Sequence, residues 1–291
     1  MLRFIHAADF HLDSAFAALT PRQAAARRRE SRELPVRLAN YVNQNNIDLV
    51  LLAGDLFDSA ASYRDTAEEL SAALGQIEAQ VYIAPGNHDW YGPGSPYLTV
   101  KWPENVHIFT QPRLETMEWP EKNLVLHGAA FTHGEQADGF LTGFTAPADG
   151  KLHIGLLHGE IDPSEARYDP IRKEEIAASG LAYLALGHIH KRAEPLTFGD
   201  TVCAWPGCPE GRGFDELGEK GFYSGTIDDS GKVSLTFVPF ARRRYEILTV
   251  DVTDQDPRAA MRRRCPPTRH RTCTVFCSPE RPARAASIRT R

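Results

Sequence analysis

Side chains that can bind a metal or a phosphate follow five short apolar runs of this sequence, each at the point where the run ends. In chain order the segments are Asp-x-His, Gly-Asp, Gly-Asn-His-Asp, His-Gly and Gly-His-x-His. Their polar side chains belong to Asp9, His11, Asp55, Asn87, His88, His158, His188 and His190. Ligands of an open α/β sheet bind outside the carboxyl ends of its strands, so these groups are expected to converge. Their types and order predict a two-metal phosphoesterase centre.

The donor set combines carboxylates, one amide and imidazoles, and it contains no cysteine. Such mixed oxygen and nitrogen ligands suit Mn²⁺, Fe²⁺ or Zn²⁺ in a reactive site, whereas structural zinc sites favour thiolates. Asp13 and Asp89 are expected only to cap the segments that follow them. The remaining histidines before the C-terminal tail are expected to be ordinary packed or surface residues: His6, His107, His127, His133 and His153.

The elements that must position these donors follow from the apolar runs. Buried strands are expected at 2–7, 48–53, 81–84, 152–157 and 182–186. Helices are expected from Pro21 to Asn45 with Thr20 as N-cap, from Tyr63 to Ile77, and from Pro170 to Gly180 with Asp169 as N-cap. This alternation predicts crossover units on a mostly parallel sheet.

Two regions are less regular than this alternation. Candidate strands at 106–109, 114–118 and 123–130 are interrupted by Pro, Gly and aromatic residues. The later segments "FYSGTID", "KVSLTFVPF" and "RYEILTVDV" alternate with a period of two and have turn residues between them, which predicts an antiparallel addition.

Size and composition are typical of a globular protein. The 291 residues, 42% hydrophobic and 24% charged, are enough for one large α/β domain. No signal-peptide pattern begins the chain, and no apolar stretch approaches the ~20 residues that span a bilayer. A cytoplasmic location without membrane attachment is therefore expected.

The formal charge of −5 combines two different pieces. The tail 258–291 carries ten of the 33 basic residues and one of the 38 acidic ones, which leaves 23 basic and 37 acidic residues, a net charge of −14, before it. The run Arg27–Arg29 is expected on the solvated face of a helix. An acidic body suits unaided DNA binding poorly, because Lys and Arg contacts to phosphate supply most non-specific affinity.

The tail also holds three of the five cysteines and shows neither helical nor strand periodicity. It is expected to be a disordered end, as out-of-frame translation or a truncated gene would produce. Two alternatives are a basic arm that contacts nucleic acid and a metal knuckle. The knuckle would use Cys265, His270, Cys273 and Cys277.

Several of the motifs carry a family resemblance. "DFH", "GDLFD", "GNHD", "LLHG" and "GHIH" resemble the motif series of calcineurin-like metallophosphoesterases. "FIHAADFHLDS", "ALGHIHK" and "WPGCPEGRGFDELGEKGF" resemble, more narrowly, SbcD-type DNA-repair exonuclease subunits, including the YhaO-like branch. The resemblance covers about residues 3–252. It implies an α/β sandwich of two mixed β-sheets packed face to face, with helices outside.

The resemblance also implies a domain plan. Residues 1–240 would form the catalytic metallophosphoesterase domain, 241–257 would begin a truncated capping region, and 258–291 would be the tail.

Carried onto this sequence, the resemblance implies two divalent ions, with Mn²⁺ as the expected metal. One ion would be held by Asp9, His11 and His190. The other would be held by Asn87, His158 and His188. Asp55 would bridge the two.

His88 would not be a ligand in such a centre. It would face the scissile phosphate and assist the leaving oxygen, and Asp58 would orient it. General-acid help of this kind is typically worth about 10²–10⁴-fold.

The implied function is a two-metal phosphodiesterase that acts on DNA, a manganese-dependent exonuclease with some endonuclease activity in a DNA-repair complex. Family members pair with an SMC-type ATPase, whose contact usually lies in the C-terminal part of the nuclease, and they commonly form homodimers. This chain departs from the family there, so its coupling to the ATPase is expected to be lost.

Three alternatives stay open on the sequence. A small-molecule or nucleotide phosphodiesterase or phosphatase would exploit the cleft that a truncated cap leaves open. A non-catalytic scaffold would keep the fold without the chemistry, although the complete donor set argues against it. A truncated, inactive copy would not accumulate.

Overall fold

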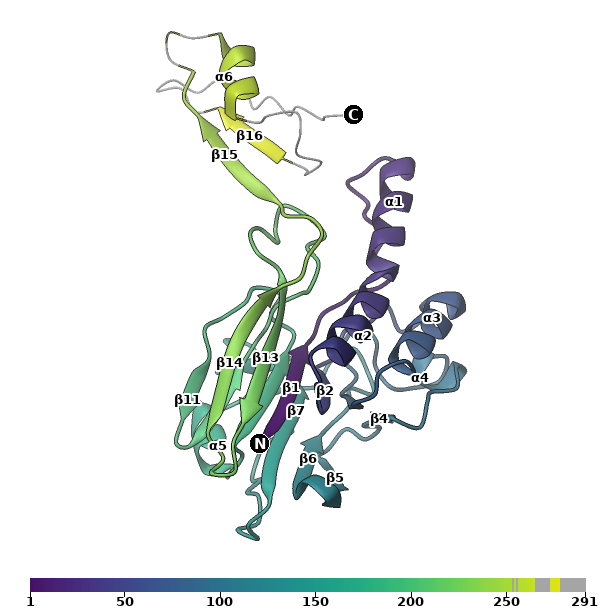
Figure 1. Cartoon of the computed structure of the whole chain (residues 1–291), viewed down its shortest axis with the longest axis vertical. Helices are drawn as coiled ribbons and strands as arrows, with labels where there is room; N and C mark the ends of the chain where they lie inside the picture. Colours follow the sequence, from purple (N-terminus) through teal and green to yellow (C-terminus); the bar gives the residue numbers. More distant parts are fainter. Residues whose placement is uncertain (253, 255, 265–272, 278–291) are drawn as a thin grey trace.

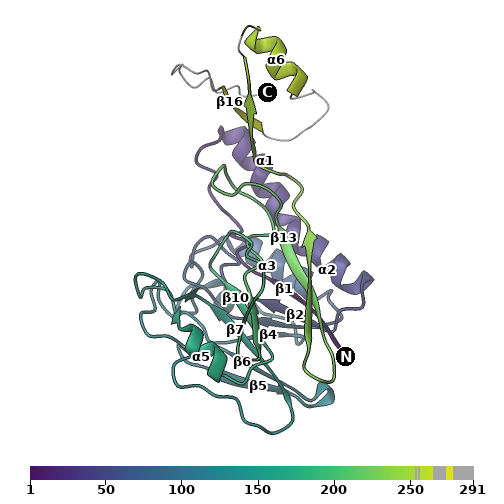
Figure 2. The same cartoon turned by 90° about the vertical axis from the view of Figure 1, so that its left-hand side faces the viewer.

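Two six-stranded β-sheets packed face to face form the body of the protein (Figures 1 and 2). The computed structural model describes residues 1–252, 254, 256–264 and 273–277. Both sheets are mixed, and helices cover their outer faces, so the predicted fold class is confirmed.

The first sheet has the order β14-β13-β1-β2-β3-β4. Its parallel strands are β1 (Leu2–Ala7), β2 (Leu49–Leu52), β3 (Gln80–Ile83) and β4 (Val106–Ile108). The hairpin of β13 (Gly221–Ile227) and β14 (Val233–Pro239) joins antiparallel to β1. These strands confirm the crossover units and, for the hairpin, the antiparallel addition.

The second sheet has the order β11-β12-β10-β7-β6-β5. Its strands are β5 (Glu115–Trp119), β6 (Leu124–Gly128), β7 (Leu152–His158), β10 (Tyr183–Gly187), β11 (Leu196–Phe198) and β12 (Thr201–Ala204). The sequence did not predict the β11–β12 hairpin. Beside this sheet, β8 (Glu160–Ile161) and β9 (Pro170–Ile171) pair in parallel.

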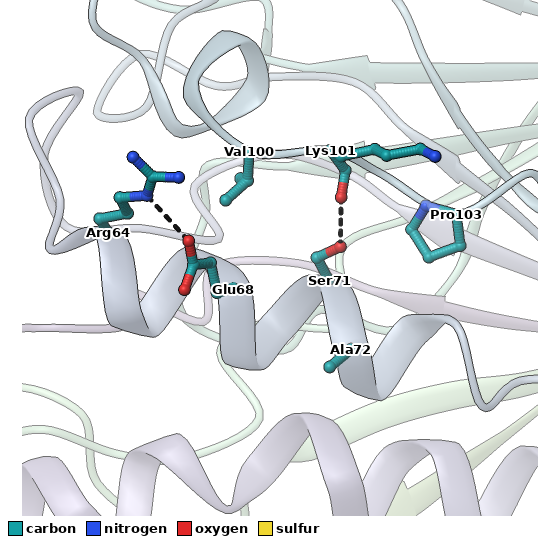
Figure 3. A pocket seen from close by; sticks show the side chains of 7 residues that line it. All are labelled: Arg64, Glu68, Ser71, Ala72, Val100, Lys101 and Pro103. Atoms are coloured by element: carbon teal, nitrogen blue, oxygen red, sulfur yellow. Dashed lines mark hydrogen bonds and ion pairs between the residues drawn. The ribbon is translucent and has the colours of Figure 1, made fainter.

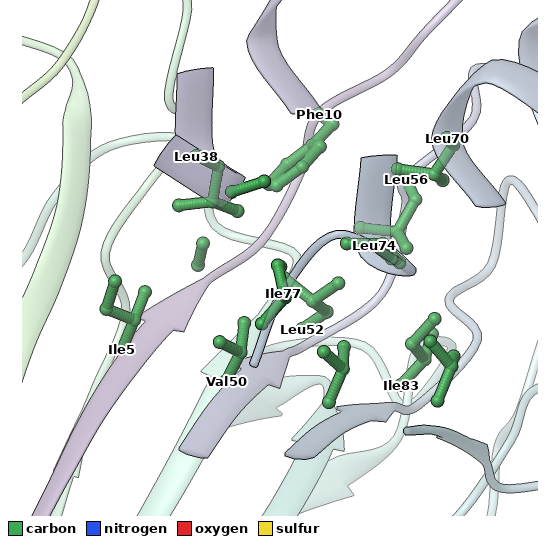
Figure 4. Packing of buried hydrophobic residues seen from close by; sticks show 14 of the residues in the cluster. Ile5, Phe10, Leu38, Val50, Leu52, Leu56, Leu70, Leu74, Ile77 and Ile83 are labelled. Atoms are coloured by element: carbon green, nitrogen blue, oxygen red, sulfur yellow. The ribbon is translucent and has the colours of Figure 1, made fainter. Parts of the chain in front are cut away.

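Alternate residues of the central strands enter different cores. In β1, Phe4 packs between the two sheets, whereas Ile5 faces the outer helices. In β2, Leu51 and Val50 divide in the same way. Figure 4 shows the outer core, in which residues such as Leu38 and Leu70 from two helices lie over the first sheet. Because both faces are buried, these strands are continuous apolar runs and not alternating ones.

Helices α1 (Pro21–Arg32), α2 (Leu34–Gln44), α3 (Arg64–Leu74) and α4 (Pro96–Thr99) belong to the first half of the chain. A short 3₁₀ helix, η1 (Pro120–Lys122), follows β5. The single helix predicted from Pro21 to Asn45 is wrong, because the chain forms two helices that meet at Glu33. Pro35 has no N–H to continue the ladder of α1, so the helix ends just before it. The predicted Thr20 cap is confirmed, with Gln23 completing a capping box.

The helix predicted from Pro170 to Gly180 is also wrong in its first part. Pro170 and Ile171 form β9, and α5 (Lys173–Ala178) begins only after Arg172. Asp169 does not cap a helix, because its Oδ1 accepts the main-chain N–H of Phe140 at 2.6 Å.

A small unit projects from one end of the sandwich, beyond α1 (Figures 1 and 2). It contains β15 (Glu246–Val250), α6 (Pro257–Arg264) and β16 (Cys273–Cys277). β15 pairs in parallel with β16, so the antiparallel addition predicted for its segment is wrong. The tail, expected to be irregular, thus contains a helix and a strand; its remaining residues, and the knuckle residues Cys265 and His270, lie outside the described residues.

Across the described part of the chain, no helix is both long enough and apolar enough to cross a membrane.

Candidate metal centre

The predicted donors come from the ends of strands in both sheets. Asp9 and His11 follow β1, Asp55 follows β2, and Asn87 follows β3, all in the first sheet. His158 ends β7, and His188 and His190 follow β10, in the second sheet. The donors therefore meet where the carboxyl ends of the two sheets face each other, which places them at the edge that binds ligands in α/β proteins.

Two groups of donor atoms form there, and they share one carboxylate. One group consists of Asp9, His11, Asp55 and His190, and the other of Asp55, His158 and His188. Within each group the potential ligand atoms lie within 4.8 Å of one another. Such spacing is compatible with a cation in each group and with Asp55 between the two.

Asn87 adds an amide oxygen to the second group. Its Oδ1 lies 3.0 Å from Nε2 of His158 and 3.1 Å from Nδ1 of His188. In the first group, Nε2 of His11 and Nε2 of His190 face each other at 3.0 Å. Each group thus presents several lone-pair atoms toward one point.

All four imidazoles have their second nitrogen held by an oxygen. Nδ1 of His11 contacts Asp58, Nδ1 of His158 contacts the carbonyl of Ala53, Nε2 of His188 contacts Glu160 and Nδ1 of His190 contacts Glu216, at 2.8–2.9 Å. A proton on the held nitrogen leaves the other nitrogen free as an acceptor that faces the centre. Metal-binding histidines are oriented in this way.

One buried oxygen supports the fit of a cation. Oδ2 of Asp9 is buried without a hydrogen-bond partner, while Oδ1 accepts the N–H of His188 at 3.0 Å. An unpaired buried carboxylate oxygen is costly, and a cation would satisfy it. The donor set and this atom fit a pair of divalent cations.

The family follows from comparison with known proteins. The family model described as calcineurin-like phosphoesterase matches residues 2–192. This protein belongs to that family. Calcineurin-like phosphoesterases use divalent metals, in agreement with the donor groups of the structure.

Three curated relatives are similar to this calcineurin-like phosphoesterase. They are the uncharacterized metallophosphoesterase YhaO of Bacillus subtilis (33% identity, 87% of this chain, 64% of the relative), the DNA double-strand break repair protein Mre11 of Methanopyrus kandleri (24%, 90% and 62%) and the SbcD component of the nuclease SbcCD of Bacillus subtilis (23%, 75% and 64%). The chain thus spans just under two thirds of the length of each.

Electrostatics in the phosphoesterase centre keep the acidic donors charged and favour a neutral His188. Burial would raise the pKa of Asp55, but the imidazoles of His158 and His11 lower it well below its ordinary value. Burial would lower the pKa of His158, but the carboxylate of Asp55 raises it to about 9. A cation at this position therefore has to displace a proton. Burial, joined by the charge of His158, lowers the pKa of His188 to about 3.

The main chain at the donors adopts an uncommon conformation. Asp9, His11, Asp55 and His188 all have positive φ, between 45° and 91°. Non-glycine residues with positive φ are uncommon and gather at functional sites, where the surrounding structure holds the strain. Sequence reasoning could not find this signal.

The glycine of the Gly-His-x-His motif has a steric reason. A Cβ at Gly187 would lie 1.7 Å from the carbonyl oxygen of Ala53 and 2.7 Å from Nδ1 of His158. The two sheets therefore approach each other too closely at this point for any side chain.

Asp89 has a larger role than the predicted cap. Its buried carboxylate accepts the N–H groups of Gly86, Asp55, Leu56 and Phe57 at 2.7–3.2 Å, and the hydroxyl of Tyr97 at 2.6 Å. It ties the turn after β2 to the turn after β3 and so sets the position of the shared carboxylate.

His88 lies at the mouth of the centre. Its main-chain N–H donates to Oδ1 of Asp55 at 2.8 Å, and its exposed ring packs edge-on against His11, with centroids 4.8 Å apart. Asp58 contacts His88 through its main-chain oxygen, 3.2 Å from Nδ1. The carboxylate of Asp58 instead contacts His11 and Arg212, unlike the orienting role predicted for it.

Sequence reasoning missed three polar residues around the donors: Glu160, Arg212 and Glu216. Glu160 and Glu216 contact His188 and His190, and Arg212 contacts Asp58 and Glu216. Arg212 and Glu216 lie within the "PGCPEGRGFDE" segment, whose presence pointed to the nuclease branch without suggesting a role.

A separate pocket of about 340 Å³ opens beside α3 (Figure 3). Arg64, Glu68 and Lys101 are among the residues that line it, and Arg64 pairs with Glu68 at 2.8 Å. None of its lining residues belongs to the donor groups, so this pocket is not part of the metal centre.

Proposed function

We propose that this protein is a two-metal phosphodiesterase that acts on DNA, as an exonuclease with some endonuclease activity. The observation that carries the proposal is the pair of donor groups that share Asp55. A shared carboxylate between two cation positions is the arrangement that two-metal hydrolysis of phosphate esters needs.

The proposed ligands divide in the manner of these groups. Asp9, His11 and His190 hold one ion. Asn87, His158 and His188 hold the other. Asp55 bridges them, and Mn²⁺ is the proposed metal because the donors are oxygens and imidazole nitrogens without thiolates.

The cations, when bound, supply neutralisation of the phosphate charge and activation of a water. The chain supplies the positions of the ligands and an exposed imidazole. His88 is proposed to face the scissile phosphate, because its main chain is fixed by Asp55 while its ring remains accessible at the mouth. From there it stabilises the developing charge and passes a proton to the leaving oxygen.

DNA is proposed as the substrate because two relatives carry nuclease or DNA-repair names. The acidic body argues for a partner that supplies DNA affinity, because phosphate contacts depend on basic residues. We therefore propose that the protein works in the cytoplasm with an SMC-type ATPase. Co-purification of the two proteins in a stoichiometric complex would support the pairing, and their separation on a sizing column would refute it.

Substrate class can be tested directly. Metal-free protein is reconstituted with Mn²⁺ and offered a labelled DNA duplex with a free 3′ end, a nucleotide phosphodiester and a phosphate monoester. The proposal expects nucleotide release from the duplex, and an Asp55→Asn variant serves as the matched inactive control. Turnover of the small substrates without cleavage of DNA would make the protein a small-molecule phosphoesterase. Absence of bound metal would instead favour a scaffold.

A further inference from the structure

The segment between β12 and β13 places an arginine beside the proposed metal centre. We call residues 208–220 of this segment the Arg212 loop. The family model ends at residue 192, so the loop lies outside the part of the chain that it matches. The role of the loop has to be derived from its own contacts.

The guanidinium of Arg212 joins two carboxylates. Its Nη1 donates to Oδ1 of Asp58 at 3.1 Å, and its Nη2 and Nε donate to Oε1 of Glu216 at 2.8 and 3.2 Å. The same two oxygens contact proposed metal ligands, since Asp58 Oδ1 lies 2.9 Å from His11 Nδ1 and Glu216 Oε1 lies 2.9 Å from His190 Nδ1. Nη2 also lies 3.0 Å from that nitrogen of His190. One side chain therefore connects the supports of two imidazoles.

Charge and burial argue against a direct role in substrate binding. The single positive charge of Arg212 lies between two negative charges, and its side chain is only 22% exposed. Its donated hydrogen bonds are directed at the carboxylates, in the forked geometry that guanidinium groups favour. Little of its charge is left to attract a phosphate, so its effect on the centre is positional.

The loop is itself fixed from several sides. The predicted solvated position of Arg27 is wrong, because this buried side chain donates to the carbonyl of Gly211 at 2.7 Å. Nζ of Lys220 donates to the carbonyl of His190 at 2.9 Å. The N–H of Arg212 donates to Glu216 at 2.7 Å. These contacts from α1 and from the turn after β10 hold the loop in one position.

The second group of donors is supported differently. Nδ1 of His158 contacts the main-chain oxygen of Ala53, and His188 contacts Glu160, whose side chain is 33% exposed. The hydrogen bonds of Arg212 to other described side chains reach His190 and the supports of His11 and His190, and none of them reaches the supports of His158 and His188. Loss of Arg212 should therefore affect the two groups unequally.

We infer that Arg212 is a positioning residue that, through Asp58 and Glu216, sets the affinity of one ion only, the ion assigned to Asp9, His11 and His190. This inference rests on the proposed function, because it takes the two donor groups as metal sites. Outer partners of metal ligands typically change metal affinity by 10–100-fold, so loss of the guanidinium should weaken this ion by about that factor.

Manganese binding to metal-free protein tests the inference. Mn²⁺ is titrated into wild type and Arg212→Gln, and binding is followed by calorimetry and by the electron paramagnetic resonance signal of coupled ion pairs. Wild type should bind two ions and show the coupled signal. Arg212→Gln should keep one ion at wild-type affinity, bind the second about 10–100-fold more weakly, and lose the coupled signal at low Mn²⁺.

Two further variants separate position from charge. Arg212→Lys keeps the charge but lacks the fork that joins two carboxylates, so it should behave like Arg212→Gln. Arg64→Gln removes an exposed arginine that pairs with Glu68 on α3, and it should bind both ions normally. A thermal unfolding curve of each metal-free variant shows that it is folded.

A double-mutant cycle tests the route through Glu216. If Arg212 acts through this carboxylate, adding Arg212→Gln to Glu216→Gln should weaken the ion by much less than the product of the two single effects. Arg212→Gln and Glu160→Gln touch different groups, so each should keep its own effect in combination. Glu216→Gln also provides the test if Arg212→Gln does not fold.

The outcomes are distinguishable. Equal weakening of both ions, unchanged binding of both, or rescue by Arg212→Lys would overturn the inference while leaving the proposed function intact. Wild-type protein that binds fewer than two ions would overturn the proposed function and this inference with it.

Discussion

The two groups of donors are held by different parts of the chain. The group of His158 and His188 lies at the ends of β7 and β10 and is supported by the main chain after β2, through the carbonyl of Ala53, and by the partly exposed Glu160. We call it the sheet-held group. The group of His11 and His190 depends on side chains, Asp58 and the buried Glu216, which Arg212 joins. We call it the loop-held group.

This difference separates what the fold provides from what a single loop provides. A main-chain carbonyl at the end of a buried strand cannot be lost by substitution, so the support of His158 is built into the sandwich. The support of the loop-held group consists of side chains, and two of them lie beyond the matched family region. One ion site is thus a property of the fold, and the other can be adjusted by changing a few residues.

The largest effect is expected at the carboxylate that both groups share. Asp55→Ala should lose both ions and lower turnover by about a thousandfold or more, because two-metal catalysis supplies several kcal/mol. Elemental analysis beside hydrolysis of a chromogenic phosphodiester measures both losses. Asp229→Ala is the control, since this carboxylate is 94% exposed and pairs with the N-terminal ammonium, away from the donors. Retention of both ions would remove Asp55 from its bridging role.

His88 tests whether chemistry and ion binding separate. His88→Ala should keep both ions and lower turnover by about 10²–10⁴-fold, the usual value of a positioned general acid. Metal content and rate are measured on the same preparation. A fully active His88→Ala would reject the assignment, and loss of an ion would make His88 a ligand.

Backbone substitutions compare the rigidity of the two groups. A methyl group at Gly187 would meet the main chain of Ala53 at 1.7 Å, so Gly187→Ala should lower the free energy of unfolding by about 3 kcal/mol. At Gly213, in the Arg212 loop, a methyl group would meet only the end of the exposed Asp215 side chain, at 2.5 Å. Gly213→Ala should change stability by no more than about 0.5 kcal/mol.

Urea unfolding of both metal-free variants measures these free energies. Equal losses would show that the loop is as tightly enclosed as the meeting point of the sheets, against the comparison drawn above.

The smallest effects are expected at the outer carboxylates. Glu216→Gln should weaken its ion by about 100-fold, whereas Glu160→Gln should weaken the other ion by about tenfold, the two ends of the usual range. The side chain of Glu216 is 4% exposed and that of Glu160 is 33% exposed, so water can replace only the second. Mn²⁺ titration gives both values, and a larger effect at Glu160 would reverse the proposed ranking.

The proposed donors were predictable because their signal is local. Each follows an apolar run that both neighbouring layers bury, and Asp, Asn and His are uncommon enough at such ends to be recognised as a set. The Pro35 break was also visible in the sequence but lost to the longer helical pattern around it. Pro removes a helix hydrogen bond whatever its neighbours prefer, so it should have outweighed that pattern.

The supports of the donors were not predictable, because they exist only after the sheets have packed. Arg212 and Asp58 lie 154 residues apart, and nothing near either residue announces the other. Asp89 and Asp169 have the local features of caps, yet each accepts main-chain N–H groups from turns brought close by the fold. Tertiary contacts decided the roles of these carboxylates.

Anomalous diffraction from crystals of the Mn²⁺-loaded protein tests the central claim most directly. Two manganese peaks are expected, one against Asp9, His11 and His190 and one against Asn87, His158 and His188, with Asp55 bound to both. A single peak, or peaks away from Asp55, would contradict the two-metal centre.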